Sequence, residues 1–259
     1  MEKLKLKLRI KKYLFIKLNL FQKANNFFID TLFPKKCLLC GKEGSWLCEI
    51  CQGKIDFVDF QICPVCERFN TPLGTPCPKC RRETSLTGLI TASRYRKEDL
   101  AILIHNFKYN FIADLGQDLG KFLLQGATIH KLPLPSILIP VPLHPRRLRW
   151  RGFNQAEILA NYLSENITPG FPIPISKEKL IRTKYTSAQM KIGNYQERKE
   201  NLRGAFAIKN PNEIKNKIIW LIDDVATTGS TLFECAKILK ENGAKKIYAL
   251  VLARQEFRK

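Results

Sequence analysis

The sequence has 259 residues, of which 45% are apolar and 26% charged, and its formal net charge at pH 7 is +21. The apolar share is enough for a folded core, which excludes a disordered chain, and the length suits one medium-sized domain with a smaller one. The excess of lysine and arginine favours anionic partners such as nucleotides, phosphorylated metabolites, nucleic acid or acidic lipid, without choosing among them.

Residues 1–36 form a lysine-rich first segment in which Leu14, Leu18 and Phe21 fit one face of a helix. We expect a basic amphipathic arm that packs on the body of the protein or frays, and contact with a membrane surface or nucleic acid is the alternative. Lysines interrupt each apolar run before it reaches the length of a signal-peptide core or a membrane span. We therefore expect a soluble, cytoplasmic protein without a transmembrane segment.

Eight of the nine cysteines form four Cys-x-x-Cys pairs within residues 37–87. This spacing is typical of zinc ligands, whereas a disulfide framework suits small secreted domains. We predict a double zinc-ribbon module with two structural Cys₄ sites. The expected ligands are Cys37, Cys40, Cys48, Cys51, Cys63, Cys66, Cys77 and Cys80. Sequential pairing puts the first four on one ion and the last four on the other; cross-braced pairing, first pair with third, stays open.

From residue 88 onward, strand and helix patterns alternate. The predicted strands are LITASRY, SILIPVP, KLIRT, GAFAI, the run from Ile218 and KKIYALVLA. The predicted helices cover residues 98–108, 113–124, 154–165, 196–201 and 230–241. Strands separated by helices predict an α/β fold for residues 88–259, with a parallel sheet flanked by helices.

The segment IIWLIDDVATTGST runs from an apolar strand into two aspartates and then into hydroxyl residues around one glycine. In parallel α/β sheets, ligands bind beyond the carboxyl ends of the strands, and the first turn of a helix favours phosphate. We therefore expect Asp223 and Asp224 at the mouth of a phosphate site. No Gly-Lys-Ser/Thr is present, which excludes a Walker loop. The aspartates suit the hydroxyls of a sugar phosphate; Mg²⁺ ligands or a helix cap are the alternatives.

This motif resembles the phosphoribosyl pyrophosphate (PRPP) binding motif of the type I phosphoribosyltransferases, with Ala226 where larger aliphatic residues are more usual. The resemblance implies that the acidic pair holds the ribose hydroxyls, that one carboxylate serves as a general base, and that the loop holds the 5′-phosphate. It also implies Mg²⁺ chelated mostly by substrate and water. The implied PRPP-binding residues are Asp223, Asp224, Ala226, Thr227, Thr228, Gly229, Ser230 and Thr231.

Three further segments are IPVPLHPRRLRWRGFNQAEILA, ERKENLRGAF and LVLARQ. They are similar to the ComF family, competence-associated proteins that join a cysteine-rich zinc module to a phosphoribosyltransferase domain. The resemblance places a pyrophosphate loop at His144, Arg146 and Arg147. Arginine suits that role because its planar guanidinium group forms paired hydrogen bonds to phosphate oxygens. A solvated basic face or a contact to nucleic-acid backbone is the alternative. Lys108 also matches a family position, but no role is assigned to it.

The polar stretch from Thr183 to Gly193 lacks a regular period and is a candidate lid that excludes water from the site. Thr183 and Gln189 are its expected flexible-loop residues, and Arg182 joins the two aspartates as a predicted catalytic residue. A plain surface loop is the alternative.

The hypothesis is a phosphoribosyltransferase-like protein that binds PRPP with Mg²⁺, transfers the phosphoribosyl group to an unidentified acceptor, and is associated with DNA uptake. Its rival is a non-catalytic, nucleic-acid-binding accessory of transformation, to which the net charge of +21 also points. The expected partners are PRPP, single-stranded DNA and proteins of the competence machinery.

Overall fold

The computed structural model describes residues 34–94, 98–110, 112–184, 202 and 204–255. The chain divides into two compact units, residues 1–52 and 53–259. Residues 1–33 of the predicted arm at 1–36 lie outside the described residues, and so does the predicted helix at 196–201. None of the helices in the described ranges combines the length and the apolar content that a membrane crossing needs. In the first unit the structure describes one short helix, α2 (Glu49–Gln52).

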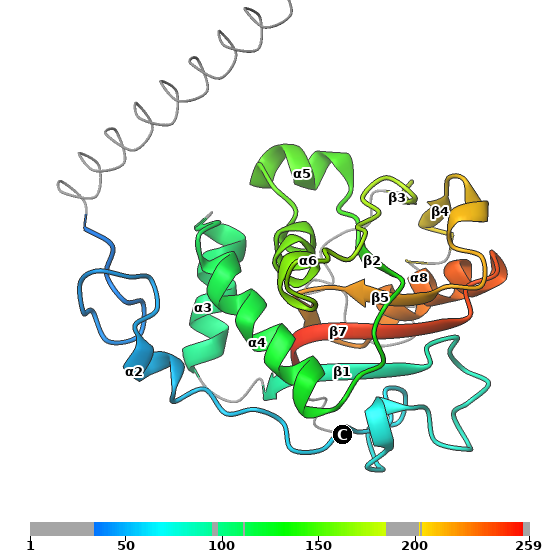
Figure 1. Cartoon of the computed structure of the whole chain (residues 1–259), viewed down its shortest axis with the longest axis horizontal. Helices are drawn as coiled ribbons and strands as arrows, with labels where there is room; N and C mark the ends of the chain where they lie inside the picture. Colours follow the sequence, from blue (N-terminus) through cyan, green and yellow to red (C-terminus); the bar gives the residue numbers. More distant parts are fainter. Residues whose placement is uncertain (1–33, 95–97, 111, 185–201, 203, 256–259) are drawn as a thin grey trace, which may run out of the picture. The chain divides into compact units, whose positions relative to one another are not determined.

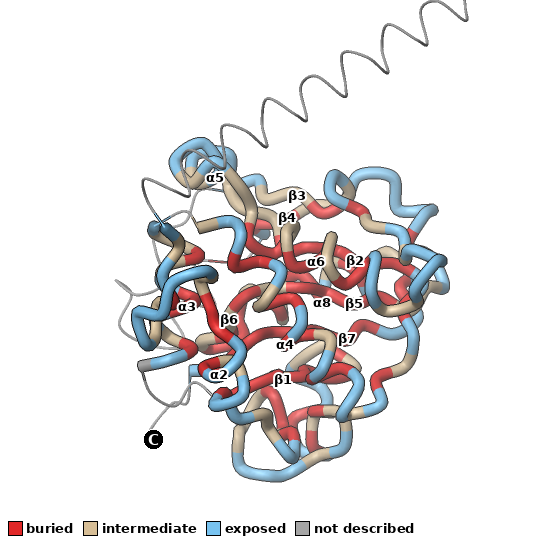
Figure 2. Tube along the Cα trace, turned by 60° about the vertical axis from the view of Figure 1, so that its left-hand side comes forward, coloured by how far each residue is buried: buried red, intermediate tan, exposed pale blue. Residues whose placement is uncertain are grey.

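A parallel sheet forms the centre of the second unit, which confirms the predicted fold class (Figure 1). Four strands lie side by side in the order β1 (Gly88–Arg94), β7 (Lys246–Arg254), β5 (Ile218–Ile222) and β2 (Ile137–Pro140). The short strand β6 (Val225–Ala226) pairs with the end of β7. Most of β2, β5 and β7 is buried (Figure 2), which explains why these strands read as continuous apolar runs.

Helices cover both faces of this sheet. Ile219 and Leu221 of β5 share a core cluster with Leu232 and Ala236 of α8 (Ser230–Glu241), so α8 covers the face toward which these alternate side chains point. On the other face, α4 (Leu115–Ile129) approaches β1 so closely that a Cβ at Gly126 would lie 2.9 Å from Ala92 Cα. The helices α3 (Glu98–Tyr109) and α6 (Gln155–Asn166) contact α4.

Two predicted strands do not join the parallel sheet. β3 (Leu180–Arg182) and β4 (Phe206–Ile208) pair with each other in antiparallel fashion. Only their inward side chains, such as Leu180 and Phe206, are buried, because the pair lies over the α8 side of the core. Single-turn 3₁₀ helices lie at Pro72–Gly74 and Pro211–Glu213, and the helix α5 (Pro145–Arg151) follows β2.

Residues 53–87 bind along the outer side of β1 and at the end of β7. The Gln61 side chain receives a hydrogen bond from the Thr91 amide at 2.9 Å and donates one to the Thr91 carbonyl at 3.0 Å. Arg254, the last residue of β7, donates to the Pro64 carbonyl at 2.6 Å and to Glu67 at 2.8 Å. The second group of cysteines is therefore attached to the sheet.

Candidate functional site

A cavity of about 510 Å³ opens where β2 and β5 end. Its volume lies within the range of small-molecule sites, and its position at the carboxyl ends of parallel strands is where α/β folds bind ligands. The walls come from the acidic pair after β5, the loop into α8, the segment after β2, the end of α3 and the end of β3. The sequence motifs therefore converge on one place.

The acidic pair is the part of the wall that carries negative charge. Asp223 follows β5 directly and is partly buried, while Asp224 is only 6% exposed. Lys108 Nζ lies 2.8 Å from Asp224 Oδ1. Burial raises the pKa of Asp223 to about 7, and the charge of Asp224 adds to this shift, against the opposing charges of Lys108 and Arg182. The pair thus combines one carboxylate neutralised by a lysine with one that titrates near neutral pH.

The raised pKa of Asp223 predicts a pH-dependent stability. Because this pKa is about 7, against 3.8 ordinarily, the folded protein holds the proton more tightly than the unfolded chain. The free energy of unfolding therefore falls as the pH rises from about 4 to about 7, and the full cost of the charge persists above that range. Asp223→Asn removes the cost, so we expect stabilisation of roughly 2–4 kcal/mol at about pH 8 and less than half of that at about pH 5.

Differential scanning calorimetry of the wild-type protein and the Asp223→Asn variant at the two pH values checks this expectation. A shift of the same size at both pH values would show that the substitution acts through packing rather than through the titration of Asp223.

Lys108 is a site residue to which the sequence assigned no role. It lies in the last turn of α3, 116 positions before its partner Asp224, and on the sequence it is one lysine among many. Only the tertiary fold brings its ammonium group to the carboxylate, so no local pattern could have identified the contact. The match to a family position was the sole available signal.

The loop after β6 divides into two kinds of residue. Thr227 and Thr231 line the cavity. Thr228 and Ser230 are instead 3% and 4% exposed, and their hydroxyl oxygens lie 2.7 Å apart. Gly229 has a φ of +76° and a Cβ there would lie 2.9 Å from the Phe233 ring, so this position requires glycine. Two threonines therefore face the cavity, and the other residues shape the loop.

Ala226 does not line the cavity. It is 2% exposed and pairs with Arg254 in β7, which fixes the start of the loop. The first-turn amide groups of α8 follow after the loop 227–229, and amides at the start of a helix favour an anion.

The arginine segment is a helix, α5 (Pro145–Arg151), where the sequence predicted a loop. His144 caps it, because its Nδ1 accepts a hydrogen bond from the Arg146 amide at 3.1 Å. Pro145 occupies the first helical position and Gly152 ends the helix with a φ of 77°. The two caps therefore stabilise this helix locally. None of its residues is buried, so the sequence shows no apolar period that would predict a helix.

Arg146 and Arg147 of α5 line the cavity and give this part of its wall positive charge. His144 is absent from the lining and acts as a cap. Partial burial lowers the pKa of His144, and the neighbouring charges of Arg182 and Arg149 lower it further, which favours the neutral ring that a cap needs.

Arg182, the last residue of β3, also lines the cavity. Burial and the charge of Arg147 lower the pKa of Arg182, while Cys235 and Asp223 oppose the shift. Thr183 is exposed and outside the cavity lining; its amide donates to the Ala205 carbonyl at 2.9 Å. Gln189 and most of the candidate lid lie outside the described residues.

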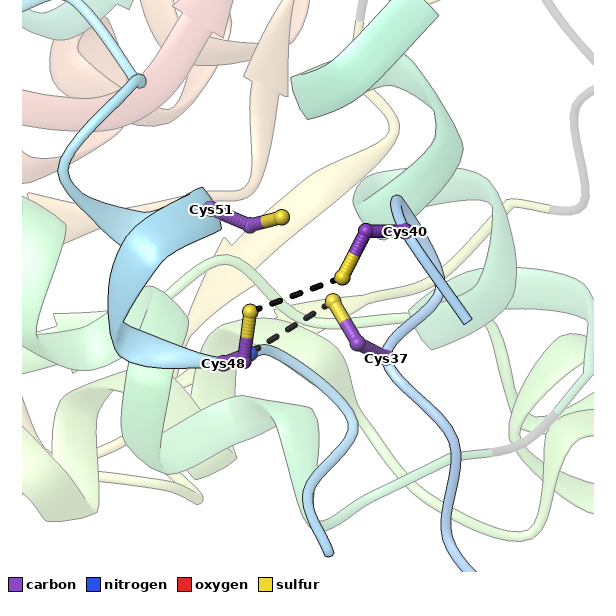
Figure 3. Close-up of side chains that lie close together, drawn as sticks. All are labelled: Cys37, Cys40, Cys48 and Cys51. Carbon is purple, nitrogen blue, oxygen red and sulfur yellow. Dashed lines mark hydrogen bonds between the residues drawn. The ribbon is translucent and has the colours of Figure 1, made fainter. Parts of the chain in front are cut away.

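The eight paired cysteines form two groups, Cys37 to Cys51 in the first unit and Cys63 to Cys80 in the second. Within each group the four sulfur atoms lie within 4.8 Å of one another. Figure 3 shows the sulfur atoms of the first group turned inward, with Cys40 and Cys48 Sγ 3.6 Å apart. In the second group Cys66 and Cys77 Sγ are 3.8 Å apart. Sequential pairing is therefore confirmed, and the cross-braced alternative is wrong.

These distances fit zinc. Tetrahedral ligands with Zn–S bonds of about 2.3 Å lie about 3.8 Å from one another. Backbone amides support the sulfur atoms, because the Cys48 amide donates to Cys37 Sγ at 3.5 Å and the Cys77 amide donates to Cys63 Sγ at 3.4 Å. Four thiolates without an open position make closed, structural sites. Cys235, fully buried in α8, belongs to the core as predicted.

Comparison with known proteins shows which families this chain resembles. A family model described as a double zinc ribbon domain matches residues 28–81, and one described as a phosphoribosyl transferase domain matches residues 151–258. The chain is 32% identical to Competence protein F of Haemophilus influenzae over 234 residues, which cover 86% of this chain and 98% of that protein.

Two further relatives have similar coverage. DNA utilization protein YhgH of Escherichia coli (strain K12) is 32% identical over 231 residues, 85% of this chain and 97% of that protein. Competence protein ComFC of Streptococcus pneumoniae is 28% identical over 245 residues, 85% of this chain and all of that protein. With two zinc-ribbon cysteine groups ahead of a phosphoribosyltransferase domain and relatives matched over nearly their whole length, this chain belongs to the ComF family.

Proposed function

We propose that the cavity binds PRPP with Mg²⁺ and that the protein transfers the phosphoribosyl group to an acceptor. The observation that carries the proposal is the convergence of Asp223, Asp224 and Thr227 with Arg147 and Arg182 on one cavity of about 510 Å³. Carboxylates accept from ribose hydroxyls, while guanidinium groups and helix amides receive phosphates. A sugar that carries phosphate at both ends matches this distribution of charge.

Each part of PRPP then has a partner in the chain. The 5′-phosphate meets Thr227, Thr231 and the first-turn amides of α8, and the ribose hydroxyls donate to the acidic pair. Arg146 and Arg147 face the pyrophosphate. Lys108 holds Asp224 in place at 2.8 Å and offsets its charge until the sugar arrives. These contacts would orient C1 of the ribose toward the open part of the cavity.

The acidic pair fits an ion that arrives with its substrate rather than a resident one, because Lys108 already occupies Asp224. Mg²⁺ bound to the pyrophosphate and ribose oxygens would neutralise the leaving group. In the transfer, a bond forms between the acceptor and C1 while the C1–O bond breaks, and its electron pair leaves with pyrophosphate. The acceptor proton passes to a carboxylate, a role that suits Asp223 because its pKa is about 7.

The names of the relatives supply a setting. They speak of competence and of DNA utilization. We place this chain in the handling of incoming DNA in the cytoplasm, with single-stranded DNA or proteins of the competence machinery as partners. The proposed organisation keeps a basic arm at 1–36, a zinc module at 37–87 and the transferase domain at 88–259.

A nucleic-acid-binding accessory without catalysis is the second candidate. The exposed residues Arg146, Arg149 and Trp150 on α5 favour it, because guanidinium groups and an aromatic ring are what single strands bind. Single-stranded DNA affinity that falls steeply with salt, together with no detectable binding of PRPP, would favour this candidate over the transferase.

Isothermal titration of the zinc-loaded protein with PRPP tests the first proposal. We expect saturable, one-to-one binding in the presence of Mg²⁺ and at least a roughly tenfold loss of affinity without it, because uncompensated phosphate charge opposes binding. Ribose 5-phosphate, which lacks the pyrophosphate, should bind more weakly. Absence of heat with folded, zinc-loaded protein would overturn the assignment of the cavity.

A further inference from the structure

The rim of the cavity carries a group of aromatic side chains that PRPP binding does not explain. Trp150 of α5 is 61% exposed and its ring centroid lies 6.2 Å from that of Tyr109 in α3. Both residues line the cavity. His105, one turn earlier in α3, lies 4.9 Å from Tyr109 between ring centroids. We call His105, Tyr109 and Trp150 the aromatic rim.

Arg151 covers one face of the Tyr109 ring. The Arg151 guanidinium carbon lies 5.4 Å from the centroid of the Tyr109 ring, within the range of a cation–π contact. Arg151 Nη1 in turn donates to Gln155 Oε1 at 3.0 Å, and Gln155 is buried at the start of α6. A buried residue thus orients the arginine that supports the tyrosine. This arrangement gives the rim a defined shape before any ligand binds.

The rim also begins beside the acidic pair. Tyr109 follows Lys108, whose ammonium group contacts Asp224. Consecutive residues of α3 therefore contact the acidic pair and form part of the aromatic rim. A ligand whose ring meets Tyr109 or Trp150 therefore lies next to the bound sugar rather than elsewhere on the surface.

Trp150 is exposed, whereas the tryptophan of the sheet, Trp220, is packed in the core. Trp220 of β5 is 2% exposed and its indole nitrogen donates to the Pro133 carbonyl at 2.9 Å, as is usual for a packed tryptophan. Trp150 instead presents its ring to solvent among Arg146, Arg147 and Arg151, which all line the cavity. Cations around an aromatic surface disfavour an apolar peptide and favour a flat ring joined to phosphate.

We propose that the aromatic rim is the acceptor site and that it stacks a planar heteroaromatic ring of the nucleobase type. The inference rests on the proposed function for its placement next to the sugar, but the stacking itself requires no PRPP. The same chemistry has two sources, a free nucleotide or the terminal nucleotide of a single strand. In both, the ring nitrogen already carries a sugar, so a hydroxyl or an exocyclic amino group of that nucleotide forms the bond to C1 and gives up its proton. Every base has a π-face, so stacking alone accepts both.

Trp150 provides its own reporter. The chain has three tryptophans, and Trp150 is the highly exposed one among them. We expect adenosine 5′-monophosphate to quench the emission of Trp150 in a saturable manner, because a stacked base quenches indole fluorescence, and ribose 5-phosphate to leave it unchanged. Calorimetry on variants then measures affinity without the reporter.

The variants separate stacking from packing. Trp150→Ala should weaken adenosine 5′-monophosphate about tenfold, whereas Trp150→Phe, which keeps a ring, should stay within about threefold of the wild type. Phe171→Ala is the matched control, since Phe171 is 80% exposed but does not line the cavity. Equal affinity in Trp150→Ala and the wild type, or quenching by ribose 5-phosphate, would overturn the proposal.

A five-nucleotide single strand distinguishes the two sources. Tighter binding than the mononucleotide, with the same dependence on Trp150, identifies the end of a strand, and equal affinity identifies the free nucleotide. Titration of the wild-type protein with PRPP alone is the separate test of the proposed function. Stacking without PRPP binding would contradict the proposed transferase function but not the stacking at the aromatic rim. PRPP binding without stacking would contradict the aromatic rim as acceptor site but not the PRPP site.

Discussion

Replacement of both Asp223 and Asp224 by asparagine is expected to lower the affinity for PRPP by at least a hundredfold. Hydrogen bonds to charged groups contribute about 1.5–3 kcal/mol each, so loss of the charge on two acceptors removes roughly 3–6 kcal/mol. Lys108, 2.8 Å from Asp224, would also lose the anion that offsets its charge. Titration calorimetry with Mg²⁺ present measures the change.

Two features of the chain keep this experiment interpretable. Asp118→Asn removes one carboxylate from the surface of α4, where Asp118 pairs with Lys121 at 3.2 Å, and should leave PRPP binding as it is. Asp223→Asn alone is expected to stabilise the fold at about pH 8, whereas Asp224→Asn removes the partner of Lys108. Scanning calorimetry of the double variant therefore has to show a folded protein before loss of binding is ascribed to the site. An acidic-pair variant that binds PRPP as tightly as the wild type would refute the site.

Removal of one cysteine ligand is expected to lower the stability of the protein much more at the second zinc site than at the first. Cys63→Ser should cost the second unit several kcal/mol, because structural Cys₄ zinc contributes on the order of 10 kcal/mol to folding. The loop between Cys63 and Cys66 carries the Pro64 carbonyl that Arg254 of β7 binds at 2.6 Å. Disorder of this loop would therefore remove one of the two acceptors of the buried Arg254 guanidinium, at the end of β7 where β6 is paired.

Cys40→Ser is the matched variant. Its site belongs to the first compact unit, residues 1–52, so we expect loss of one zinc per chain and little change in the main calorimetric transition. Metal analysis by atomic emission, together with scanning calorimetry, distinguishes the variants: both should lose one zinc, and only Cys63→Ser should lower the main melting temperature by about 10 °C or more. Equal shifts for both would contradict the assignment of the two zinc sites to separate compact units.

Much of this molecule could be predicted from its sequence wherever the information is local. The Cys-x-x-Cys pairs and the Asp223–Asp224 motif specify chemistry within a few residues, and parallel strands buried on both faces appear as apolar runs. The assignment of cysteines to the two groups needed coordinates, because spacing alone is compatible with sequential and cross-braced pairing. The structure then showed the sequential one.

The rest of the site depends on contacts between distant segments. Tyr109 and Trp150 lie 41 positions apart, and nothing in either helix indicates the other. α5 escaped prediction because its helix depends on the His144 cap and not on an apolar period. β3 and β4 were assigned to the parallel sheet because a three-residue apolar run carries no sign of its partner or direction.

The Gln61 side chain covers part of the exposed edge of the sheet. Its amide meets the backbone of Thr91 as a neighbouring strand would, and the Val58 amide continues the pattern by donating to the Ala92 carbonyl at 3.1 Å. β1 is an edge strand, and exposed edges recruit other chains. The segment around Gln61 thus covers an edge that would otherwise be open to other chains. We expect loss of zinc to uncover this edge and to promote aggregation.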